Sequence, residues 1–415
     1  MNLFLLVLPL LVIVGLLFCK THMLVAAFIG GVLAAIIGGL DMGTVNSSFT
    51  AGVAQMMGIT VPILYAATAA MVAKGGSIKA IVDLAGHYLK GRLAILAAFL
   101  VIIQALATYM AGMGASNTMV IAPLIAAAVG FVPEVIAGLA IATAVGFTTS
   151  PASSETALAA EMAGRDVVEH AAAMRPFTIV FFLIGAALAA YGVYKRGTMV
   201  KENKQADKEQ MSLGLMWKTA IPALALLVMV VAGGNLNNLV GFTIFTPGTT
   251  VMFTTVLTVF LTKMNANESA KALIDGSKFI LMTLFSVGMF LGFINLLGEI
   301  GTFSELAALA GRVPDVLVLP AAMLIAFIVA FPAGAFAAGV LALVLPTLAN
   351  LGMPSEAMGF VAIAVGLGTQ ISPVQINVAA LSDGFEISVM DVIRANLKFV
   401  LAALALLLVL AVIFV

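Results

Sequence analysis

Long apolar runs recur along the whole chain and constrain its fold more than any other feature. Each is about 17–22 residues long, enough for a helix to cross a hydrocarbon core of about 30 Å. Of the 415 residues, 63% are hydrophobic and only 9% are charged. A soluble domain is nearer a quarter charged, so we expect the bilayer to be the solvent for most of this surface. Because lipid tolerates no unpaired backbone, the runs predict an all-α polytopic membrane protein.

The predicted membrane segments form two sets separated by a polar linker. The first set covers residues 3–18, 23–40, 55–73, 93–111, 119–130, 134–148 and 176–194. The second set covers residues 219–232, 241–262, 279–297, 317–331, 335–350, 355–371 and 399–415. The first run lacks a positively charged lead-in and a small-residue cleavage site, so we expect a retained helix rather than a signal peptide.

Basic residues are distributed unevenly between the two sides that these segments define. All of the 19 basic residues except Arg165, Arg175 and Arg312 fall on one side. Cytoplasmic loops carry an excess of Lys and Arg, which predicts a cytoplasmic linker at 195–218 and both termini outside. We expect a multi-pass protein of a bacterial-type cytoplasmic (inner) membrane. No lysine or arginine falls inside a predicted apolar run.

The two halves of the chain align with each other at an offset of about 222 residues. The matched positions are Pro123 with Pro346, Pro133 with Pro354, Ser150-Pro151 with Ser372-Pro373, and Phe177 with Phe399. A capping-box spacing, at Asp166 with Glu169 and at Ser388 with Asp391, also marks a helix start in each half. Each half holds an odd number of segments, which are seven helices or about five transmembrane helices plus one re-entrant hairpin. The second half must then be inserted upside down, so the sequence predicts two inverted-topology repeats at 1–194 and 219–415.

Glycine, proline and polar residues interrupt the apolar helices at two places in each half. These places predict hairpins at about 93–130 and 317–350, and broken helices at about 134–163 and 355–385. Proline removes an N–H and clashes with an earlier carbonyl, so the helices break before Pro151 and Pro373, which we expect at the midplane.

Such a break offers binding groups for ions of both signs. The N-terminus of the restarted half-helix favours an anion. Carbonyl and hydroxyl oxygens at the end that stops favour a cation such as Na+. With no basic residue in an apolar run, an anionic substrate would depend on helix ends, hydroxyls, amides and bound cations rather than on a buried guanidinium.

Glu155 is the acidic residue nearest to a predicted break. A carboxylate at membrane depth costs about 2.5–3.5 kcal/mol on insertion scales, so it would need a proton or a cation there. This makes Glu155 a candidate for coupling to H+ or Na+. The alternative is that the break lies near the outer surface and Glu155 is solvated.

The tripeptide Ser116-Asn117-Thr118 at the first predicted hairpin tip, followed by a broken helix, resembles the ion transporter (IT) superfamily. Its divalent-anion/sodium symporters carry a Ser-Asn-Thr motif at such a tip. The Ser150-Pro151 pair, the Ile371-Ser372-Pro373-Val374 stretch and the capped helix after it follow an order similar to that of the DcuC-type C4-dicarboxylate carriers. The resemblance implies a homodimer that carries small di- or tricarboxylates by alternating access, with early helices as scaffold and a moving transport domain.

The helix breaks and the resemblance together give the candidate ligand residues. The substrate-binding candidates are Ser116, Asn117, Thr118, Ser150, Pro151, Ser153, Ser154, Thr369, Ser372, Pro373, Gln375 and Asn377. The cation-coupling candidates are Asn117, Glu155, Thr156, Gly334 and Thr369. The second tip, Gly334-Ala335-Phe336, departs from the Ser-Asn-Thr motif, which puts a symmetric pair of sodium sites in doubt.

Other functions are either disfavoured or left open by the same residues. The three scattered histidines form no metal constellation and no catalytic triad or phosphate loop is found, so we expect no enzyme and no cofactor beyond a coupling Na+ or H+. Equal numbers of acidic and basic residues leave no footprint for nucleic acid. A cation/proton antiporter that depends on Glu155, and the membrane subunit of a binding-protein-dependent importer, remain alternatives.

Overall fold

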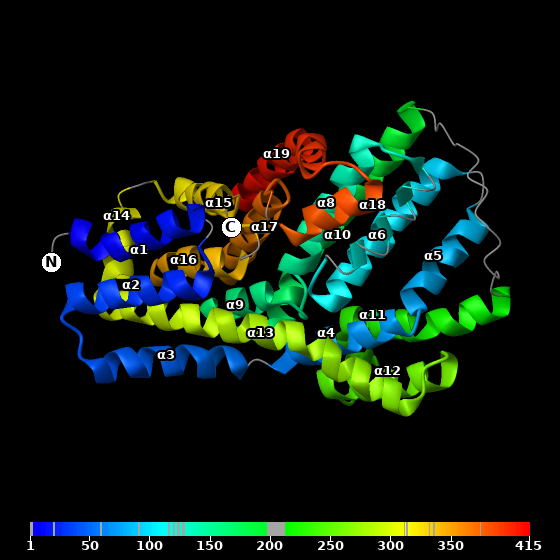
Figure 1. Cartoon of the computed structure of the whole chain (residues 1–415), viewed down its shortest axis with the longest axis horizontal. Coiled ribbons are helices and arrows are strands. Elements are labelled where there is room, and N and C mark those ends of the chain that lie inside the picture. The colour runs from blue at the N-terminus through cyan, green and yellow to red at the C-terminus, as the bar shows by residue number, and fades with distance from the viewer. Residues whose placement is uncertain are drawn as a thin grey trace.

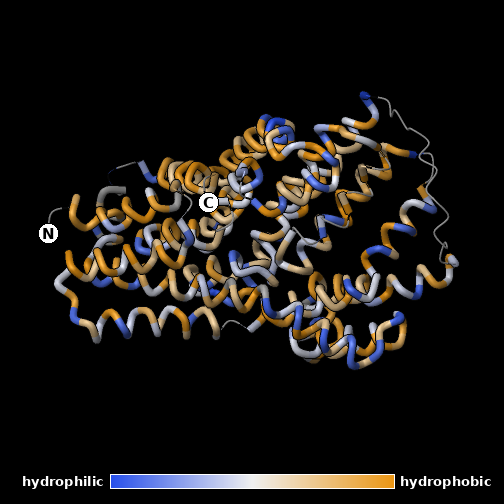
Figure 2. The backbone as a smooth tube through the Cα atoms, in the orientation of Figure 1, coloured by the Kyte–Doolittle hydropathy of each residue, from blue (hydrophilic) through white to orange (hydrophobic). Residues whose placement is uncertain are grey.

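The computed structural model is helical over the residues that it describes. These are 3–19, 21–58, 60–89, 92–114, 117–118, 121–122, 125–126, 129–196, 212–310, 312, 314–331, 333–334, 337–373 and 375–415. The predicted all-α class is confirmed for this part of the chain, and hydrophobic residues lie along nearly every helix (Figure 2).

The described helices fall into two successive series (Figure 1). The first series is α1 (Leu3–Phe18), α2 (Met23–Gly38), α3 (Met42–Met57), α4 (Thr60–Lys74), α5 (Ser77–Tyr88), α6 (Leu93–Ala111), α8 (Pro133–Thr148), α9 (Ser154–Met162) and α10 (Val167–Arg196). The second series is α11 (Leu213–Val240), α12 (Pro247–Leu261), α13 (Ala266–Glu299), α14 (Thr302–Ala310), α15 (Asp315–Ala330), α16 (Ala337–Asn350), α17 (Ser355–Thr369), α18 (Ile376–Phe385) and α19 (Val389–Phe414).

Several of these helices are long and apolar enough to cross a bilayer. Within the described residues, α6, α10, α13, α19 and the first 21 residues of α11 meet that condition, and the α3–α4 pair, bent by 49°, would make a sixth span. Of the shorter apolar helices, α8 and α17 are buried along nearly their whole length. The chain is a multi-pass membrane protein by this architecture.

The helix starts of the two series correspond at the offset found in the sequence. The starts of α15, α17, α18 and α19 match those of α6, α8, α9 and α10. With the small drift seen upstream, α5 corresponds to α14, and the bent α3–α4 pair corresponds to the continuous α13. The correspondence supports the two-repeat organisation, which stays a prediction.

The ends of α10 show how the equivalent helices α8 and α17 are oriented. Arg165, just before α10, pairs through Nη1 with Oε1 of Glu356 at the start of α17, at 3.1 Å. Arg196, the last residue of α10, pairs through Nε with Oε2 of Glu134 at the start of α8, at 2.9 Å. A helix of 30 residues is about 45 Å long, so α8 and α17 begin at opposite ends of it. Their opposite directions support the inverted-repeat prediction.

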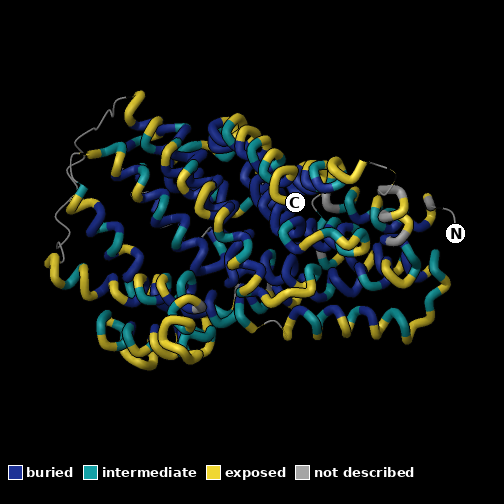
Figure 3. Tube along the Cα trace, turned by 180° about the vertical axis from the view of Figure 1, so that it is seen from behind, coloured by how far each residue is buried: buried dark blue, intermediate teal, exposed yellow. Residues whose placement is uncertain are grey.

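α8 and α17 cross at the centre of the molecule. A Cβ added to Gly366 of α17 would lie 2.9 Å from the carbonyl oxygen of Ala144 and 2.7 Å from Cγ2 of Thr148, both in α8. Nearly every residue of both helices is buried, as the dark central helices of Figure 3 show. The crossing therefore lies in the core, about one turn before each helix ends.

A second bundle lies beside this crossing. α13 packs along α3 and α4 (Figure 1). A Cβ at Gly52 would lie 2.5 Å from the Gly288 carbonyl oxygen and the Gly292 nitrogen, so the two backbones touch through small residues, as in many membrane helix pairs. We call α3, α4, α12 and α13 the α13 bundle, and α6, α8, α9, α10 and α15–α19 the crossing bundle.

Several predicted segments start later than the helices that contain them, among them 279–297 in α13 (Ala266–Glu299) and 399–415 in α19 (Val389–Phe414). The segment expected at 176–194 begins at Val167, because Asp166 caps α10 by accepting a hydrogen bond from the Val168 N–H at 2.8 Å. Arg175 therefore lies inside α10 but just before the run that was predicted as apolar, as Lys278 in α13 and Lys398 in α19 lie just before theirs. The start of the 55–73 segment lies instead at Met42, behind the Asp41 cap.

The predicted linker is shorter than expected. α10 continues to Arg196 and α11 begins at Leu213, so 195–196 and 213–218 are helical. Residues 197–211 lie outside the described residues.

Candidate functional site

The first helix break separates α8 from α9 and is held by buried hydroxyls. Ser153 caps α9, because its Oγ accepts a hydrogen bond from the Thr156 N–H at 3.0 Å. The Oγ of Ser150 donates to the Tyr109 carbonyl of α6 and accepts from the peptide N–H two residues on. Pro151 is also buried. The candidates of the first half thus include groups that already satisfy one another.

The tip of the first hairpin packs directly against this break. Gly112 ends α6 in the left-handed region with φ 68°, and a Cβ there would collide with the carbonyl oxygen of Ala152. Asn117 is 6% exposed and donates through Nδ2 to the Met113 carbonyl at 3.4 Å. Ser116 lies outside the described residues.

The second helix break separates α17 from α18 and is less fully satisfied. Gln375, the N-cap of α18, makes no side-chain capping hydrogen bond within the described residues. Ser372 is buried, whereas Pro373 is exposed. At the second hairpin tip, a Cβ on Gly334 would collide with Oγ of Ser372. Each hairpin tip therefore meets the break of its own half.

A buried hydrogen-bond chain joins the first hairpin to the second break. Nε2 of Gln104 donates to Oγ1 of Thr118 at 2.6 Å, and that hydroxyl donates to Oδ1 of Asn377 at 2.6 Å. Nδ2 of Asn377 donates to Oε1 of Gln370 at 2.7 Å, and Nε2 of Gln370 donates to Oγ1 of Thr369 at 3.1 Å. The structure thus brings Thr118, Asn377 and Thr369 together, although they come from both halves.

This chain of hydrogen bonds also contains residues that the sequence analysis did not select as site candidates. Gln104 and Gln370 are both fully buried amides within it. Oε1 of Gln104 is buried and has no hydrogen-bond partner among the described residues. The same holds for Oδ1 of Asn396, whose Nδ2 donates to the Gln370 carbonyl at 3.2 Å. A buried polar atom without a hydrogen bond costs free energy. These two oxygens are therefore unused acceptors of the hydrogen-bond network. Their signal in the sequence is an amide inside an apolar run.

Glu155 lies in the first turn of α9, next to the first break. It is partly exposed, and its Oε2 accepts a hydrogen bond from Oγ of Ser154 at 3.0 Å. No described lysine or arginine forms an ion pair with it. At the offset between the halves, Glu155 corresponds to Asn377. One half therefore places a carboxylate where the other places an amide.

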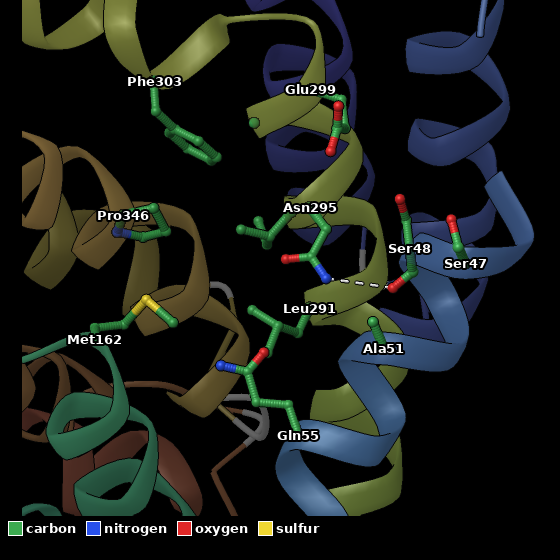
Figure 4. A pocket seen from close by; sticks show the side chains of 12 residues that line it. Ser47, Ser48, Ala51, Gln55, Met162, Leu291, Asn295, Glu299, Phe303 and Pro346 are labelled. Atoms are coloured by element: carbon green, nitrogen blue, oxygen red, sulfur yellow. Dashed lines mark hydrogen bonds between the residues drawn. The ribbon is translucent and has the colours of Figure 1, made fainter. Parts of the chain in front are cut away.

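A cavity of about 570 Å³ lies between the two bundles (Figure 4). Its α13-bundle wall is polar and includes Ser48, Gln55 and Asn295, while Met162 and Pro346 line the other side. Nε2 of Gln55 donates to Oε1 of Glu161 in α9 at 2.7 Å, which links the bundles. None of the predicted site residues lines this cavity. The described residues include no group of three His, Cys, Asp or Glu side chains that could hold a metal ion.

Comparisons with known proteins show the fold. No protein-family model and no curated protein sequence matches the chain. The chain is similar to the crystal structure of the Alcanivorax borkumensis YdaH transporter, whose topology is described as unusual, with a TM-score of 0.55 and 19% identity. The match covers 90% of this chain and 89% of that chain. The architecture described above is thus shared with a solved membrane transporter over most of both lengths.

Proposed function

We propose that this chain is a secondary active transporter of small organic anions, with C4-dicarboxylates or related di- or tricarboxylates as substrates. One observation carries the proposal. The buried chain from Gln104 through Thr118 and Asn377 ties the hairpin of one half to the helix break of the other. The likeness to a transporter fold supports the same conclusion.

The chemistry of the second break suits a carboxylate. Gln375 makes no side-chain cap at the N-terminus of α18 among the described residues, and Gln375 and Ile376 at its start are partly or largely exposed. Free N–H groups and the positive end of the helix dipole favour an anion. The amide of Asn377 and the hydroxyls of Thr118 and Ser372 supply further polar contacts nearby.

The chemistry of the first break suits the coupling ion. Ser153 already caps α9, and Glu155 adds a carboxylate to the same turn. An acid without a basic partner at membrane depth gains from a bound proton or Na+. Asn117, Thr156 and Gly334, with Thr369, are the other proposed coupling positions. Transport is driven by Na+ or H+ or proceeds by exchange.

The two bundles provide the moving parts of an alternating-access, elevator-type cycle. The α13 bundle acts as the scaffold of a homodimer in a bacterial-type inner membrane, with both termini outside. The crossing bundle carries the site past it. The polar cavity at their junction, with the hydrogen bond from Gln55 to Glu161, gives this movement an aqueous boundary on one side.

Uptake into proteoliposomes tests the proposal. We expect labelled succinate, fumarate or citrate to accumulate under a Na+ or pH gradient or against an internal carboxylate, and Asn377→Ala to abolish most of it. If no organic anion moves under any gradient, the proposal is wrong. Cation–proton exchange that needs no organic anion but requires Glu155 would assign the chain to the antiporters. Activity that appears only with an added binding protein would assign it to the importers.

A further inference from the structure

A pocket of about 450 Å³ opens where α19 packs against the start of α8. Phe131 and Pro133 line it from the first half of the chain, and Asp391, Arg394 and Lys398 line it from α19. Two of these three charged side chains are basic. None of the candidate site residues lies in its wall, so this pocket is separate from the proposed substrate and coupling sites.

The ion pair between Arg196 and Glu134 shows at which end of the molecule this pocket lies. Pro133, which precedes Glu134, belongs to the pocket wall. Glu134 receives two hydrogen bonds from Arg196, the last residue of α10, at 2.9 and 3.0 Å. The segment that follows α10 is the linker that we expect in the cytoplasm. The pocket therefore lies at the end where the headgroups of the cytoplasmic leaflet are expected.

Positive charge exceeds negative charge in the wall of this pocket. Asp391 exchanges hydrogen bonds with Ser388, which caps α19, and its contact with Nη1 of Arg394 is long, at 3.4 Å. Lys398 forms no ion pair with any described residue, and its Nζ lies 4.7 Å from the ring centroid of Phe399. Arg394 and Lys398 are both exposed. An anion in the pocket would meet both cations, one of them without an ionic partner.

An exposed stripe on α19 leads from the pocket into the bilayer. Met390, Arg394, Leu397 and Leu401 are all exposed, and their spacings of four, three and four residues place them on one helix face. Because α19 is long and apolar enough to span the membrane, acyl chains cover the exposed apolar side chains of this face. Arg394 belongs both to the stripe and to the pocket wall. A molecule with an anionic headgroup and acyl chains would therefore contact both surfaces at once.

We propose that this pocket binds the headgroup of an anionic phospholipid of the cytoplasmic leaflet, with the acyl chains along Leu397 and Leu401. The guanidinium of Arg394 offers two parallel N–H donors to the phosphate, and the ammonium of Lys398 adds a second positive charge. Basic pockets between membrane helices on the cytoplasmic side bind anionic headgroups by the same chemistry. The pocket is separate from both helix breaks, so lipid binding does not depend on which substrate is carried.

Lipid titration of the purified full-length chain tests this site. Native mass spectrometry measures the Kd of the first bound lipid for phosphatidylglycerol and for phosphatidylcholine with the same acyl chains. We expect Arg394→Gln with Lys398→Gln to lower the preference for phosphatidylglycerol on the order of 10- to 30-fold, because each lost cation weakens the attraction about fivefold. The matched control is Lys271→Gln with Lys278→Gln. It removes two exposed lysines of α13 that we expect on the same side, and it should leave the preference within about twofold.

The outcomes decide between a lipid site and a general attraction to basic residues. If the α19 double variant keeps the preference, or the α13 control loses as much of it, the inference is wrong. Glycerol 3-phosphate, which has no acyl chains, should bind far more weakly than phosphatidylglycerol, and equal affinity would make a free phosphate ester the ligand instead. Should the double variant not fold, Arg394→Gln and Lys398→Gln alone should each lower the preference about fivefold. Unchanged preference in both single variants would overturn the inference.

Discussion

The restarted half-helices α9 and α18 occupy equivalent places in the two halves but differ at their N-termini. In α9, Ser153 caps the backbone and Glu155 neutralises the positive end of the helix dipole. In α18, Gln375 makes no side-chain cap within the described residues, and Asn377 stands where the offset places Glu155. The halves repeat a geometry but not its charge. One break therefore suits a cation, and the other leaves its N-terminus for an anion.

The hairpin tips offer the most severe test of this difference. Gly112→Ala should cost about 2–5 kcal/mol of stability and abolish uptake, because a Cβ there is strained at φ 68° and meets backbone that cannot move aside. Gly334→Ala should cost less, about 1–3 kcal/mol, since Gly334 has no left-handed φ and an added Cβ there would meet the side chain of Ser372, its Cβ at 2.4 Å included, rather than backbone. Thermal unfolding and succinate uptake measure both effects. Adding Ser372→Gly, which removes both Oγ and Cβ of that side chain, should relieve Gly334→Ala. Equal damage from the two glycine changes even in that background would contradict the comparison.

Removing the carboxylate of the first break should separate coupling from binding. Glu155→Gln should lower gradient-driven uptake on the order of 100-fold, which corresponds to about 2.7 kcal/mol in the transport barrier. Carboxylate binding should stay within about threefold of wild type, because the anion is assigned to other groups. Glu169→Gln is the control, since Glu169 is an exposed acidic residue in the first turn of the next helix, α10. A Glu155→Gln protein with normal gradient dependence would show that coupling lies elsewhere.

Removing the amide of Asn377 at the second break should weaken substrate binding rather than coupling. Asn377→Ala deletes the acceptor of Thr118 and the donor to Gln370, so we expect the Kd for carboxylate to rise about 10-fold or more. Titration calorimetry measures the change. Asn350→Ala removes an amide that bonds only within its own helix, to the Pro346 carbonyl, and should leave binding unchanged. Equal weakening by the two changes would refute a specific role for the second break.

The smallest difference concerns the equivalent glutamates at the starts of α8 and α17. The side chain of Glu134 is 8% exposed and receives two hydrogen bonds from Arg196, so Glu134→Gln should cost about 1.5–3 kcal/mol. The side chain of Glu356 is 32% exposed and receives one bond from Arg165, so Glu356→Gln should cost about 0.2–1 kcal/mol. Chemical denaturation in detergent measures the loss of unfolding free energy in each variant. A larger loss of stability in Glu356→Gln than in Glu134→Gln would contradict the role given to the burial of these two side chains.

The parts of the fold that sequence predicts are those set by local chemistry. The breaks before Pro151 and Pro373 follow from the missing proline N–H, and both lie between helices in the structure. The start of α10 was marked by its Asp166 cap, yet hydropathy excluded the turns up to Arg175 because Glu169, His170 and Arg175 lie among their apolar residues.

The contacts that make the candidate site depend on tertiary packing. No spacing indicates that Thr118 would donate to Asn377, which is 259 residues away. Gln104 stood out only as an amide in an apolar run, and its position beside Thr118 follows from how α6 packs. Polar residues of α3 such as Ser48 resemble a loop to hydropathy, whereas the structure places them on a helix that lines a cavity.

The crossing of α8 and α17 has a consequence for how the molecule is put together. Ala144 and Gly366, which touch there, are counterparts of each other in the two halves. A position that meets its own counterpart lies on a two-fold axis, as in the self-complementary interface of two identical subunits. Under the predicted inverted repeat, the centre of this chain would have the geometry of a small antiparallel dimer whose two subunits are joined in one polypeptide. A larger side chain at Ala144 or Gly366 would therefore force the two halves apart at their contact.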